Sequence, residues 1–441
     1  MKHFLSLSIL AMMVAACSSE EPMPVPDNSA QQQGSVKVTI EEAIKIANQA
    51  AEAFDAKSAR GVSRRASSAA MVDVLGAKNG RSGGIDTLLY MVNYDNKQGY
   101  AIVSASRACE TLLGIVDEGE FNALEAAENP SYSYYLANAQ NYVASTLGGG
   151  ISIGGDPITP GFIEETRFVH EDYPAKVTVK WGQRYPEGYF CPNKISGCAQ
   201  TAMAQIMSYL KLPTSISLTY PERDVDVQVL DWEDMTKHTQ SVNTTAVSLI
   251  NSHNSSCAAT EASHMAIARL CRELGYRNNA TYGTSSTSAM RYNARRTFMQ
   301  LVPEREFSEL ITLGTDYSAL FEAIKTSVGY IRGNDVNGAG GHGWVIDGGR
   351  RIGKTVTVSG PGTIGIDGKE HPYVRDYTTY YYHFNWGWNG LDNGYFEMGV
   401  FDTSKGEESP GVAVAGPGIG SRANYDFSDD VQYFIVKYNK D

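Results

Sequence analysis

Residues 197–207 read GCAQTAMAQIM, a stretch that places one cysteine at the start of an amphipathic helix. Its apolar residues recur at helical spacing and predict one face turned toward a core, while Pro213 predicts the end of the helix. That face consists of Ala199, Ala202, Met203, Ile206, Met207 and Leu210. Cys198 then lies in the first turn, where unpaired backbone N–H groups and the helix dipole favour a thiolate over a thiol. Because the thiolate is the reactive form of cysteine, the stretch predicts a nucleophile.

A packed structural cysteine is the alternative explanation for Cys198, and two downstream segments argue against it. His342 stands where the glycine-rich sequence GGHG enters a short apolar strand, and Asn385 lies within the aromatic segment HFNWGW. A thiol nucleophile requires an imidazole to accept its proton and return it to the leaving amine, and the imidazole requires a partner that fixes its tautomer. Cysteine, histidine and asparagine in this chain order are typical of papain-type enzymes.

Upstream of the cysteine, the segment WGQRYP contains Gln183. An amide N–H from this side chain, together with the backbone N–H of Cys198, would form an oxyanion hole for the charge that appears on the scissile carbonyl during attack. A lone glutamine or a lone histidine is a weak signal. In this order, the residues together predict an amide-cleaving enzyme.

These segments resemble the streptopain family of bacterial secreted cysteine proteases, which have a papain-like fold and are made as zymogens. The similar segments are WGQ with YP, GC with TAMAQIM, GGH with VIDG, and NWGW with a following glycine. The resemblance extends less specifically over most of residues 35–441. It implies an α+β fold in which a helical subdomain carries the cysteine and a curved antiparallel sheet carries the histidine and the asparagine.

Carried over residue by residue, the resemblance implies Cys198 as nucleophile, His342 as general base and acid, and Gln183 as oxyanion donor. It also implies that Asn385 and Trp386 orient and shield the imidazole. The expected reaction is hydrolysis of peptide bonds in protein or peptide substrates, through a thiolate–imidazolium pair and a thioester acyl-enzyme.

Residues 282–288 are similar to the substrate-binding loop of this family, whose small residues let an extended peptide lie close to the backbone. The substrate-binding residues expected here are Ser286, Thr287 and Ser288, together with Gly341 beside the histidine. The family usually has a glycine where Thr287 stands, so a narrower subsite is expected. A second departure is the long stretch after the histidine segment, in which residues 350–380 predict an added hairpin.

The N-terminus predicts export. An apolar run at residues 4–16 follows Lys2, ends in small residues and is too short to span a bilayer as a mature helix. The sequence VAAC at residues 14–17 matches the bacterial lipobox, so we expect cleavage before Cys17 and acylation of its thiol. The lipid would anchor the chain to the outer membrane or the cell surface. A plain signal peptide is the alternative.

Five segments are expected along the chain. Residues 1–16 form the signal peptide, 17–34 a flexible tether, 35–146 a small α+β pro-domain, 147–166 a linker with the activation cleavage, and 167–441 the catalytic domain. The resemblance implies that the pro-domain inhibits the enzyme until another protease, or the enzyme itself, cuts the linker and frees it from the membrane. A mere spacer is the alternative. The pro-domain pattern predicts helices over residues 39–56 and 132–145, and strands over 88–93, 100–104 and 112–116.

Composition favours a folded, exported protein. The chain has 441 residues, 42% hydrophobic content and a net charge of -12, which argues against nucleic acid as a partner. Besides Cys17 and Cys198, four cysteines remain, and their spacing matches neither a disulfide framework nor a metal site. They are expected to be free thiols, and neither a metal nor another cofactor is expected. These four are Cys109, Cys191, Cys257 and Cys271.

Four other functions stay open on the sequence alone. A transpeptidase, amidase or glutaminase could use the same machinery. A surface adhesin or carbohydrate-binding lipoprotein without catalysis is favoured only by the 26 tyrosines. A catalytically silent relative and a protease inhibitor built from the pro-domain are the other two, and the presence of both Cys198 and His342 argues against them.

Overall fold

The computed structural model describes residues 37–56, 63–67, 72–78, 85–146, 152–153, 156–157, 162–239, 259–289, 293–314, 317–334, 341–359, 371–401 and 431–437. The expected signal peptide and tether, including Cys17, lie outside these residues, as does Cys257. Within the described part, no helix is long and apolar enough to cross a membrane.

Helices and strands alternate irregularly along the chain. The described helices are α1 (Ile40–Asp55), α2 (Ala123–Glu128), α3 (Pro130–Thr146), α4 (Cys198–Leu210), α5 (Trp232–Met235), α6 (Glu261–Arg277), α7 (Asn293–Leu301) and α8 (Ser318–Thr326), with 3-10 turns η1 (Asp95–Lys97) and η4 (Met398–Phe401). The strands of the N-terminal half are β1 (Val72–Lys78), β2 (Ile85–Asn93), β3 (Tyr100–Ser104), β4 (Leu112–Val116), β5 (Ser152–Ile153), β6 (Asp156–Pro157), β7 (Phe162–Tyr173), β8 (Ser215–Ser217) and β9 (Val227–Val229). The later strands are β10 (Thr281–Tyr282), β11 (Thr287–Ser288), β12 (Ile311–Thr312), β13 (Ser327–Asn334), β14 (Gly341–Ser359), β15 (Tyr373–Asn385), β16 (Gly394–Glu397) and β17 (Gln432–Lys437).

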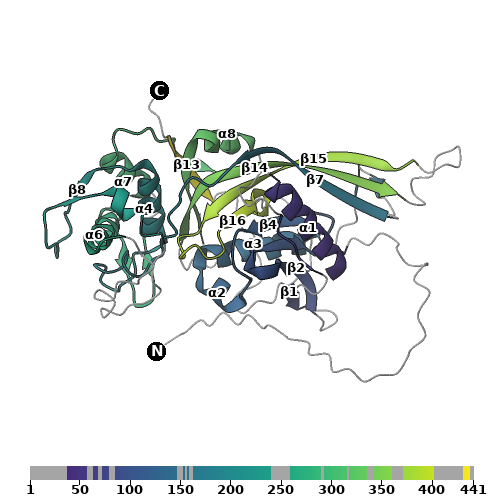
Figure 1. The fold of residues 1–441 in the computed structure, drawn as a ribbon, viewed down its shortest axis with the longest axis horizontal. Coiled ribbons are helices and arrows are strands. Elements are labelled where there is room, and N and C mark those ends of the chain that lie inside the picture. The colour runs from purple at the N-terminus through teal and green to yellow at the C-terminus, as the bar shows by residue number, and fades with distance from the viewer. Residues whose placement is uncertain are drawn as a thin grey trace, which may run out of the picture.

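One antiparallel sheet runs through the molecule and joins its N-terminal part to its catalytic part (Figure 1). The strand order is β1-β2-β3-β4-β16-β15-β14-β13-β17-β12, with β7 paired to β14. The junction lies between β4 and β16, where residues 394–396 pair with residues 114–116. The N-terminal strands therefore belong to the same sheet as the strands that carry His342 and Asn385.

The expected elements of residues 35–146 are present. Helix α1 begins after Thr39, which forms a capping box with Glu42: each side chain accepts a hydrogen bond from the backbone N–H of the other residue. Side chains alternate along β2, so Val92 packs with α1 and Met91 packs with α3. Helices α1 and α3 consequently cover opposite faces of this part of the sheet.

Strands β7, β14 and β15 form a three-stranded ribbon that extends far from the helical subdomain (Figure 1). We call this ribbon, residues 162–173, 349–359 and 373–382, the arm. Its β14–β15 part is the hairpin expected between residues 350 and 380. Strand β7 differs from expectation, because it begins at Phe162, inside the segment predicted as a linker, and pairs along its length with β14.

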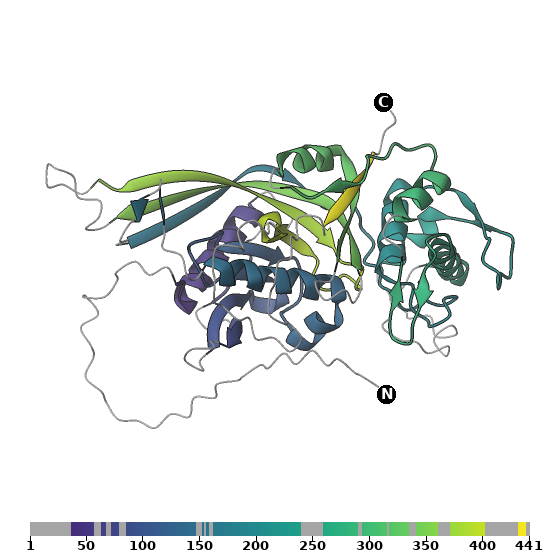
Figure 2. The same ribbon diagram turned by 180° about the vertical axis from the view of Figure 1, so that it is seen from behind.

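The helical subdomain contains α4, α6 and α7 and lies at one end of the molecule in both views (Figures 1 and 2). Helix α4 has Cys198 in its first turn and ends before Pro213, as predicted, and its six predicted core residues are buried. The subdomain packs on one face of the catalytic sheet, where Val345 of β14 joins its core. The preceding residue, Trp344, lies on the opposite face of the sheet, in the core that contains α3. Strand β14 thus presents alternate residues to the helical subdomain and to the N-terminal part.

Candidate active site

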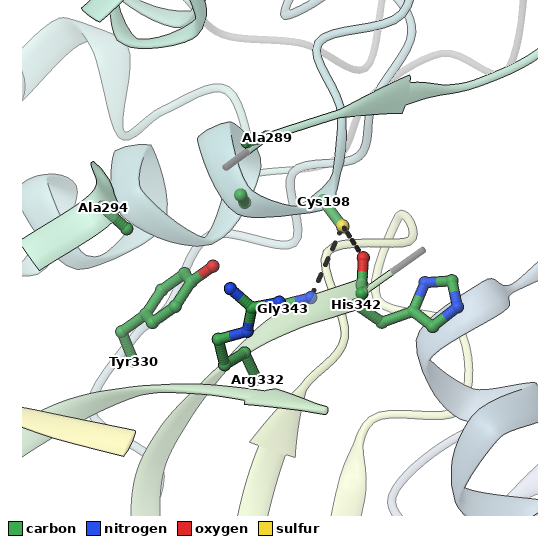
Figure 3. Close-up of a pocket in the computed structure, with 9 residues that line it drawn as sticks. Cys198, Ala289, Ala294, Tyr330, Arg332, His342 and Gly343 are labelled. Atoms are coloured by element: carbon green, nitrogen blue, oxygen red, sulfur yellow. Dashed lines mark hydrogen bonds between the residues drawn. The ribbon is translucent and has the colours of Figure 1, made fainter. Parts of the chain in front are cut away.

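Cys198 is the first residue of α4. It follows Gly197, whose φ of 92° is a conformation that favours glycine. The sulfur accepts a hydrogen bond from the backbone N–H of Gly343 at 3.4 Å and lies 4.0 Å from the carbonyl oxygen of Gly341 (Figure 3). The start of α4 and the start of β14 therefore meet at the sulfur.

Cys198 does not have the lowered pKa that its place at a helix start predicts. Burial of the sulfur raises its pKa, although the backbone N–H groups of Gly343 and Ala199 act in the opposite direction. Desolvation outweighs the helix start in this arrangement, in which the ring of His342 points away from the sulfur (Figure 3). The thiol form is favoured here.

His342 lies on the other face of β14. Because side chains alternate along a strand, His342 shares a face with Trp344, whereas Gly343 faces Cys198. The imidazole lies 6.2 Å, centroid to centroid, from the ring of Tyr134 on α3. The structure thus brings the backbone beside His342 to the nucleophile but does not bring the imidazole, because the ring lies on the face covered by the N-terminal part.

Asn385 faces α4 rather than His342. Its Oδ1 accepts a hydrogen bond from Nε2 of Gln205 at 3.0 Å, and its Nδ2 donates to the carbonyl oxygen of Val179 at 2.9 Å. Asn385 is paired with Val345, so it already lies on the face of the sheet that carries the nucleophile. Its predicted contact with the imidazole requires His342 to reach that face.

Trp386 is buried in the core shared with α3. Its ring lies 5.8 Å from that of Tyr132 and 6.1 Å from that of Tyr135, measured between centroids. Its Nε1 donates to the carbonyl oxygen of Asp392 at 2.8 Å. The predicted shielding residue is therefore in contact with the N-terminal part, and its role toward the imidazole stays a prediction.

Gln183 is buried close to the start of α4. Its carbonyl oxygen accepts a hydrogen bond from the backbone N–H of Ser196 at 2.9 Å, which ties it to the residue two positions before Cys198. This location is compatible with the predicted oxyanion role, which stays a prediction.

The predicted substrate-binding loop lies against the same helix start. The hydroxyl of Thr287 donates to the carbonyl oxygen of Ile195 at 2.8 Å, while Ser286 and Ser288 are exposed. A Cβ at position 197 would lie 3.0 Å from the carbonyl oxygen of Thr287, so the glycine before Cys198 allows this close approach. The Thr287 side chain thus fixes the loop beside the nucleophile.

Two pocket residues escaped the sequence prediction. The pocket beside Cys198 is lined by Tyr330 and Arg332 of β13, together with Ala199, Ala289, Ala294 and residues 341–343 (Figure 3). The available signal is a charged residue placed directly after the apolar run at residues 328–331. A charged side chain within a buried strand needs an explanation. The alternation of side chains between the two faces of the strand does not give one.

His383 was also missed, and it connects the two parts of the chain. Its Nδ1 lies 2.6 Å from Oδ1 of Asp347, and its Nε2 lies 3.1 Å from Oδ2 of Asp117, the residue after β4. Burial by itself lowers the pKa of His383, but the two carboxylates outweigh it and raise the pKa to about 10. A protonated imidazole therefore bridges the catalytic sheet and the N-terminal part.

The three other cysteines with described positions are not part of the site. Cys109, Cys191 and Cys271 are free thiols, and burial raises the pKa of each. Among the residues with described positions, no group of three histidine, cysteine or acidic side chains is placed to hold a metal ion.

Comparison with known proteins finds relatives for both parts of this chain. Residues 181–396 match the peptidase C10 family, and residues 35–143 match the Spi protease inhibitor family. The thiol protease/hemagglutinin PrtT of Porphyromonas gingivalis is 24% identical, over 76% of this chain and 36% of its own length. Streptopain of Streptococcus pyogenes serotype M1 is 22% identical, over 69% of this chain and 73% of its own length. This chain thus spans only about a third of PrtT, as the 36% coverage shows.

A solved structure shows the same fold. The prointerpain A fragment of Prevotella intermedia superposes with a TM-score of 0.50 at 18% identity, covering 84% of this chain and 99% of the fragment. The expected α+β, papain-like fold is confirmed. The segments around Cys198, His342 and Asn385 all fall within the matched residues 181–396. Through these residues the chain belongs to the peptidase C10 family, the streptopain family of cysteine endopeptidases.

Proposed function

We propose that this chain is the zymogen of an exported cysteine endopeptidase that hydrolyses peptide bonds in proteins. The observation that carries the proposal is the 3.4 Å contact between the sulfur of Cys198 and the N–H of Gly343, the residue after His342. It brings the nucleophile to the segment that carries the base, within reach of the predicted substrate-binding loop.

In the proposed reaction, the thiolate of Cys198 attacks the scissile carbonyl carbon, and the resulting oxyanion is held by the backbone N–H of Cys198 and the amide of Gln183. The imidazolium of His342 gives its proton to the leaving amine as the C–N bond breaks, which leaves a thioester. His342 then takes a proton from water, whose oxygen attacks the thioester carbonyl. The C–S bond breaks, the peptide leaves as a carboxylic acid, and the thiolate–imidazolium pair is restored. Neither step needs a further cofactor.

The described state is proposed to be latent. Cys198 lacks its base because His342 lies on the opposite face of β14, beside Tyr134 of the N-terminal part. Gly341 and Gly343 flank the histidine, so the backbone can rotate there with little steric resistance. Activation then consists of moving the imidazole to the face that Gly343 and Asn385 already occupy.

A buried network of charges holds the N-terminal part on the arm. Glu110, before β4, lies 2.7 Å from Nζ of Lys354 and 3.0 Å from the guanidinium of Arg167. Arg167 also lies 3.0 Å from Glu165, which lies 3.4 Å from Arg107. Burial alone raises the pKa of Glu110, but Lys354 and Arg167 reverse this and hold it at about 2. Breaking one buried pair leaves an unpaired buried charge, so these contacts resist separation.

These contacts predict that activation needs two events. Cleavage between the end of α3 at Thr146 and the start of β7 at Phe162 interrupts the chain but leaves the charge network, the His383 bridge and the β4–β16 pairing in place. We therefore propose that the cut N-terminal part stays bound and inhibitory until it is itself released or degraded. The cut can be made by another protease or by the enzyme itself.

The test uses the full chain without its signal peptide, before and after limited trypsin treatment. Processing should produce casein hydrolysis and covalent labelling by an epoxide inhibitor of papain-type enzymes, together with a new N-terminus between residues 147 and 161. Cys198→Ala should abolish both signals, whereas Cys109→Ala, which removes another free thiol, should retain them. Full activity in the uncut chain would refute latency, and no activity after loss of the N-terminal part would refute the endopeptidase.

We also propose that Cys17 carries the lipid anchor, which the lipobox at residues 14–17 supports. Cells fed a labelled fatty acid should incorporate label into the wild-type chain and not into Cys17→Ala. The labelled form should fractionate with membranes, and the processed protease should be found unlabelled in the medium. Label in the Cys17→Ala chain, or an active species that still begins at Cys17, would contradict this part of the proposal.

A further inference from the structure

Helix α4 carries a buried glutamine on the same face as the nucleophile. Gln205 follows Cys198 by seven residues, which is close to two helical turns, so both side chains leave the same side of α4. None of the surface of Gln205 is exposed. A polar side chain that is fully buried needs hydrogen-bond partners, and those of Gln205 come from two other segments of the catalytic part.

Both partners lie next to groups that are proposed to act in catalysis. Nε2 of Gln205 donates one hydrogen bond to the carbonyl oxygen of Trp181 at 3.1 Å and another to Oδ1 of Asn385 at 3.0 Å. Trp181 lies two residues before Gln183, the proposed oxyanion donor. Asn385 is the proposed partner of the His342 imidazole. One amide group thus links the nucleophile helix, the oxyanion segment and the strand that carries Asn385.

The orientation of the Asn385 amide is fixed by its neighbours. Its Nδ2 donates to the carbonyl oxygen of Val179 at 2.9 Å, and its Oδ1 also accepts a hydrogen bond from the backbone N–H of Gly387 at 3.2 Å. Since a carbonyl oxygen only accepts and a backbone N–H only donates, the two ends of the Asn385 side chain cannot be exchanged. The amide oxygen of Asn385 therefore faces the helix that carries the nucleophile.

Packing alone does not explain a glutamine at position 205. Its Oε1 is buried and accepts no hydrogen bond within the part of the chain that the structure describes. A buried oxygen without a donor costs free energy, and an apolar side chain of the same size would avoid that cost. The two hydrogen bonds donated by Nε2 are therefore what distinguishes Gln205 from an apolar residue at this position.

We infer that Gln205 is a positioning residue that acts on catalysis through Asn385; this inference rests on the proposed endopeptidase function. When the imidazole of His342 reaches this face of β14, its N–H donates to Oδ1 of Asn385, in place of the longer bond from Gly387. Gln205 holds that oxygen in position by donating to it from α4. An oxygen held in this way stabilises the imidazolium more than the neutral imidazole, so the thiolate–imidazolium pair persists to higher pH.

The alternative is a purely structural role, in which Gln205 only joins α4 to Trp181 and to β15. Loss of a structural bond lowers the free energy of unfolding, and its effect on turnover adds to the effect of a change at Asn385. A residue that acts through Asn385 loses its effect on turnover once Asn385 is removed. It also changes the pH at which the ion pair is lost. A double-mutant cycle and a pH profile therefore separate the two roles.

The experiment combines Gln205→Met with Asn385→Ala in the processed enzyme. Gln205→Met keeps the size of the side chain and removes both donors, so it should lower kcat on a fluorogenic peptide about 3- to 10-fold with little change in KM, the equivalent of one hydrogen bond. The alkaline limb of the rate of inactivation by the epoxide inhibitor should move to lower pH, because the imidazolium is less stabilised. In the Asn385→Ala background, the same substitution should have almost no further effect on kcat.

Two further variants and a titration complete the design. Gln205→Leu repeats the test with a second apolar side chain. Gln200→Met is the matched control, because Gln200 is another fully buried glutamine of α4 and its amide makes no hydrogen bond to any residue that the structure describes. This control should keep the wild-type pH profile. Active-site titration with the epoxide inhibitor corrects each variant for its folded fraction.

Four results would overturn the inference in distinguishable ways. Wild-type kcat and pH profile in both Gln205 variants refute the role of Gln205 and leave the endopeptidase intact. Equal losses from Gln205→Met with and without Asn385→Ala assign a structural role to Gln205 instead. Unchanged kcat in Asn385→Ala removes the residue through which Gln205 is inferred to act. No hydrolysis of any peptide by the processed wild type refutes the proposed function itself.

Discussion

The two faces of strand β14 differ in their readiness for catalysis. On one face, Gly343 already contacts Cys198, and this arrangement is built by the catalytic part of the chain alone. On the other face, one residue away, His342 lies beside Tyr134 of the N-terminal part. In the proposed function, activation therefore needs only a local change at the start of β14 that carries the imidazole from one face of the strand to the other. The proposed latency is thus a question of which face carries the imidazole, not of building a new site.

The largest effect on peptide hydrolysis is expected when either the proposed nucleophile or the proposed base is removed. Cys198→Ala or His342→Ala should lower peptide hydrolysis by the processed enzyme on the order of 10⁴-fold or more, because each is required for the same covalent step. Thermal unfolding of the uncut chain should change little for Cys198→Ala. Near wild-type turnover in either variant would contradict the proposed pair.

A smaller loss is expected at the oxyanion site. Gln183→Ala should reduce kcat about 100- to 1000-fold with little change in KM, since the donor acts on charge that appears only in the transition state. Steady-state kinetics on a fluorogenic peptide gives both values. A change confined to KM would make Gln183 a substrate contact.

A substitution in helix α3 of the N-terminal part can test what holds His342 on its present face of β14. Tyr134→Ala removes the ring against which the imidazole rests, so the uncut chain should react with the epoxide inhibitor up to about tenfold faster, the equivalent of one aromatic contact. Tyr142→Ala removes another buried tyrosine of α3 and should leave the rate unchanged. Equal acceleration in both variants would show general loosening of α3 rather than release of His342.

The smallest effect concerns the charges on the arm. The pKa of Glu110 is about 2 when the N-terminal part is bound, against 4.5 in an unfolded chain, so its contribution is complete above pH 4.5 and is lost as the pH falls toward 2. The cut N-terminal part should therefore dissociate progressively over this interval in size-exclusion chromatography. Glu110→Gln should bind more weakly at neutral pH and lose part of the pH dependence. Identical profiles for both proteins would exclude Glu110 as a docking group.

Local features of the structure were predictable from the sequence. Helix α4 was predictable, because its apolar spacing indicates the buried face and Pro213 indicates the end of the helix. The hairpin of β2 and β3 was predictable for the same kind of reason, since the pattern of each strand and the polar turn between them are close in sequence. Cys198 could be predicted as the nucleophile because its place at a helix start and the order of the cysteine, histidine and asparagine segments can both be seen in the sequence.

Features that depend on distant partners were not predictable. Strand β7 contains Glu165 and Arg167, and such charges normally indicate exposed chain. Their burial becomes understandable only beside Glu110 and Lys354, which come from other parts of the chain. The face taken by His342 likewise depends on packing against α3 and not on its own segment. Periodicity gives the alternation of a strand but does not specify which partner lies on each side.

Strand β16 lies in the middle of the sheet only while β4 is paired with it. Loss of the N-terminal part leaves backbone N–H and C=O groups of residues 394–396 as an open sheet edge. An open edge is a template on which another extended chain can add a strand, and it promotes aggregation unless something covers it. We therefore expect the N-terminal part to limit aggregation, in addition to the inhibitory role proposed for it. In the proposed exported enzyme, loss of the N-terminal part before export would expose a reactive thiol and an open sheet edge together inside the cell that makes the protein.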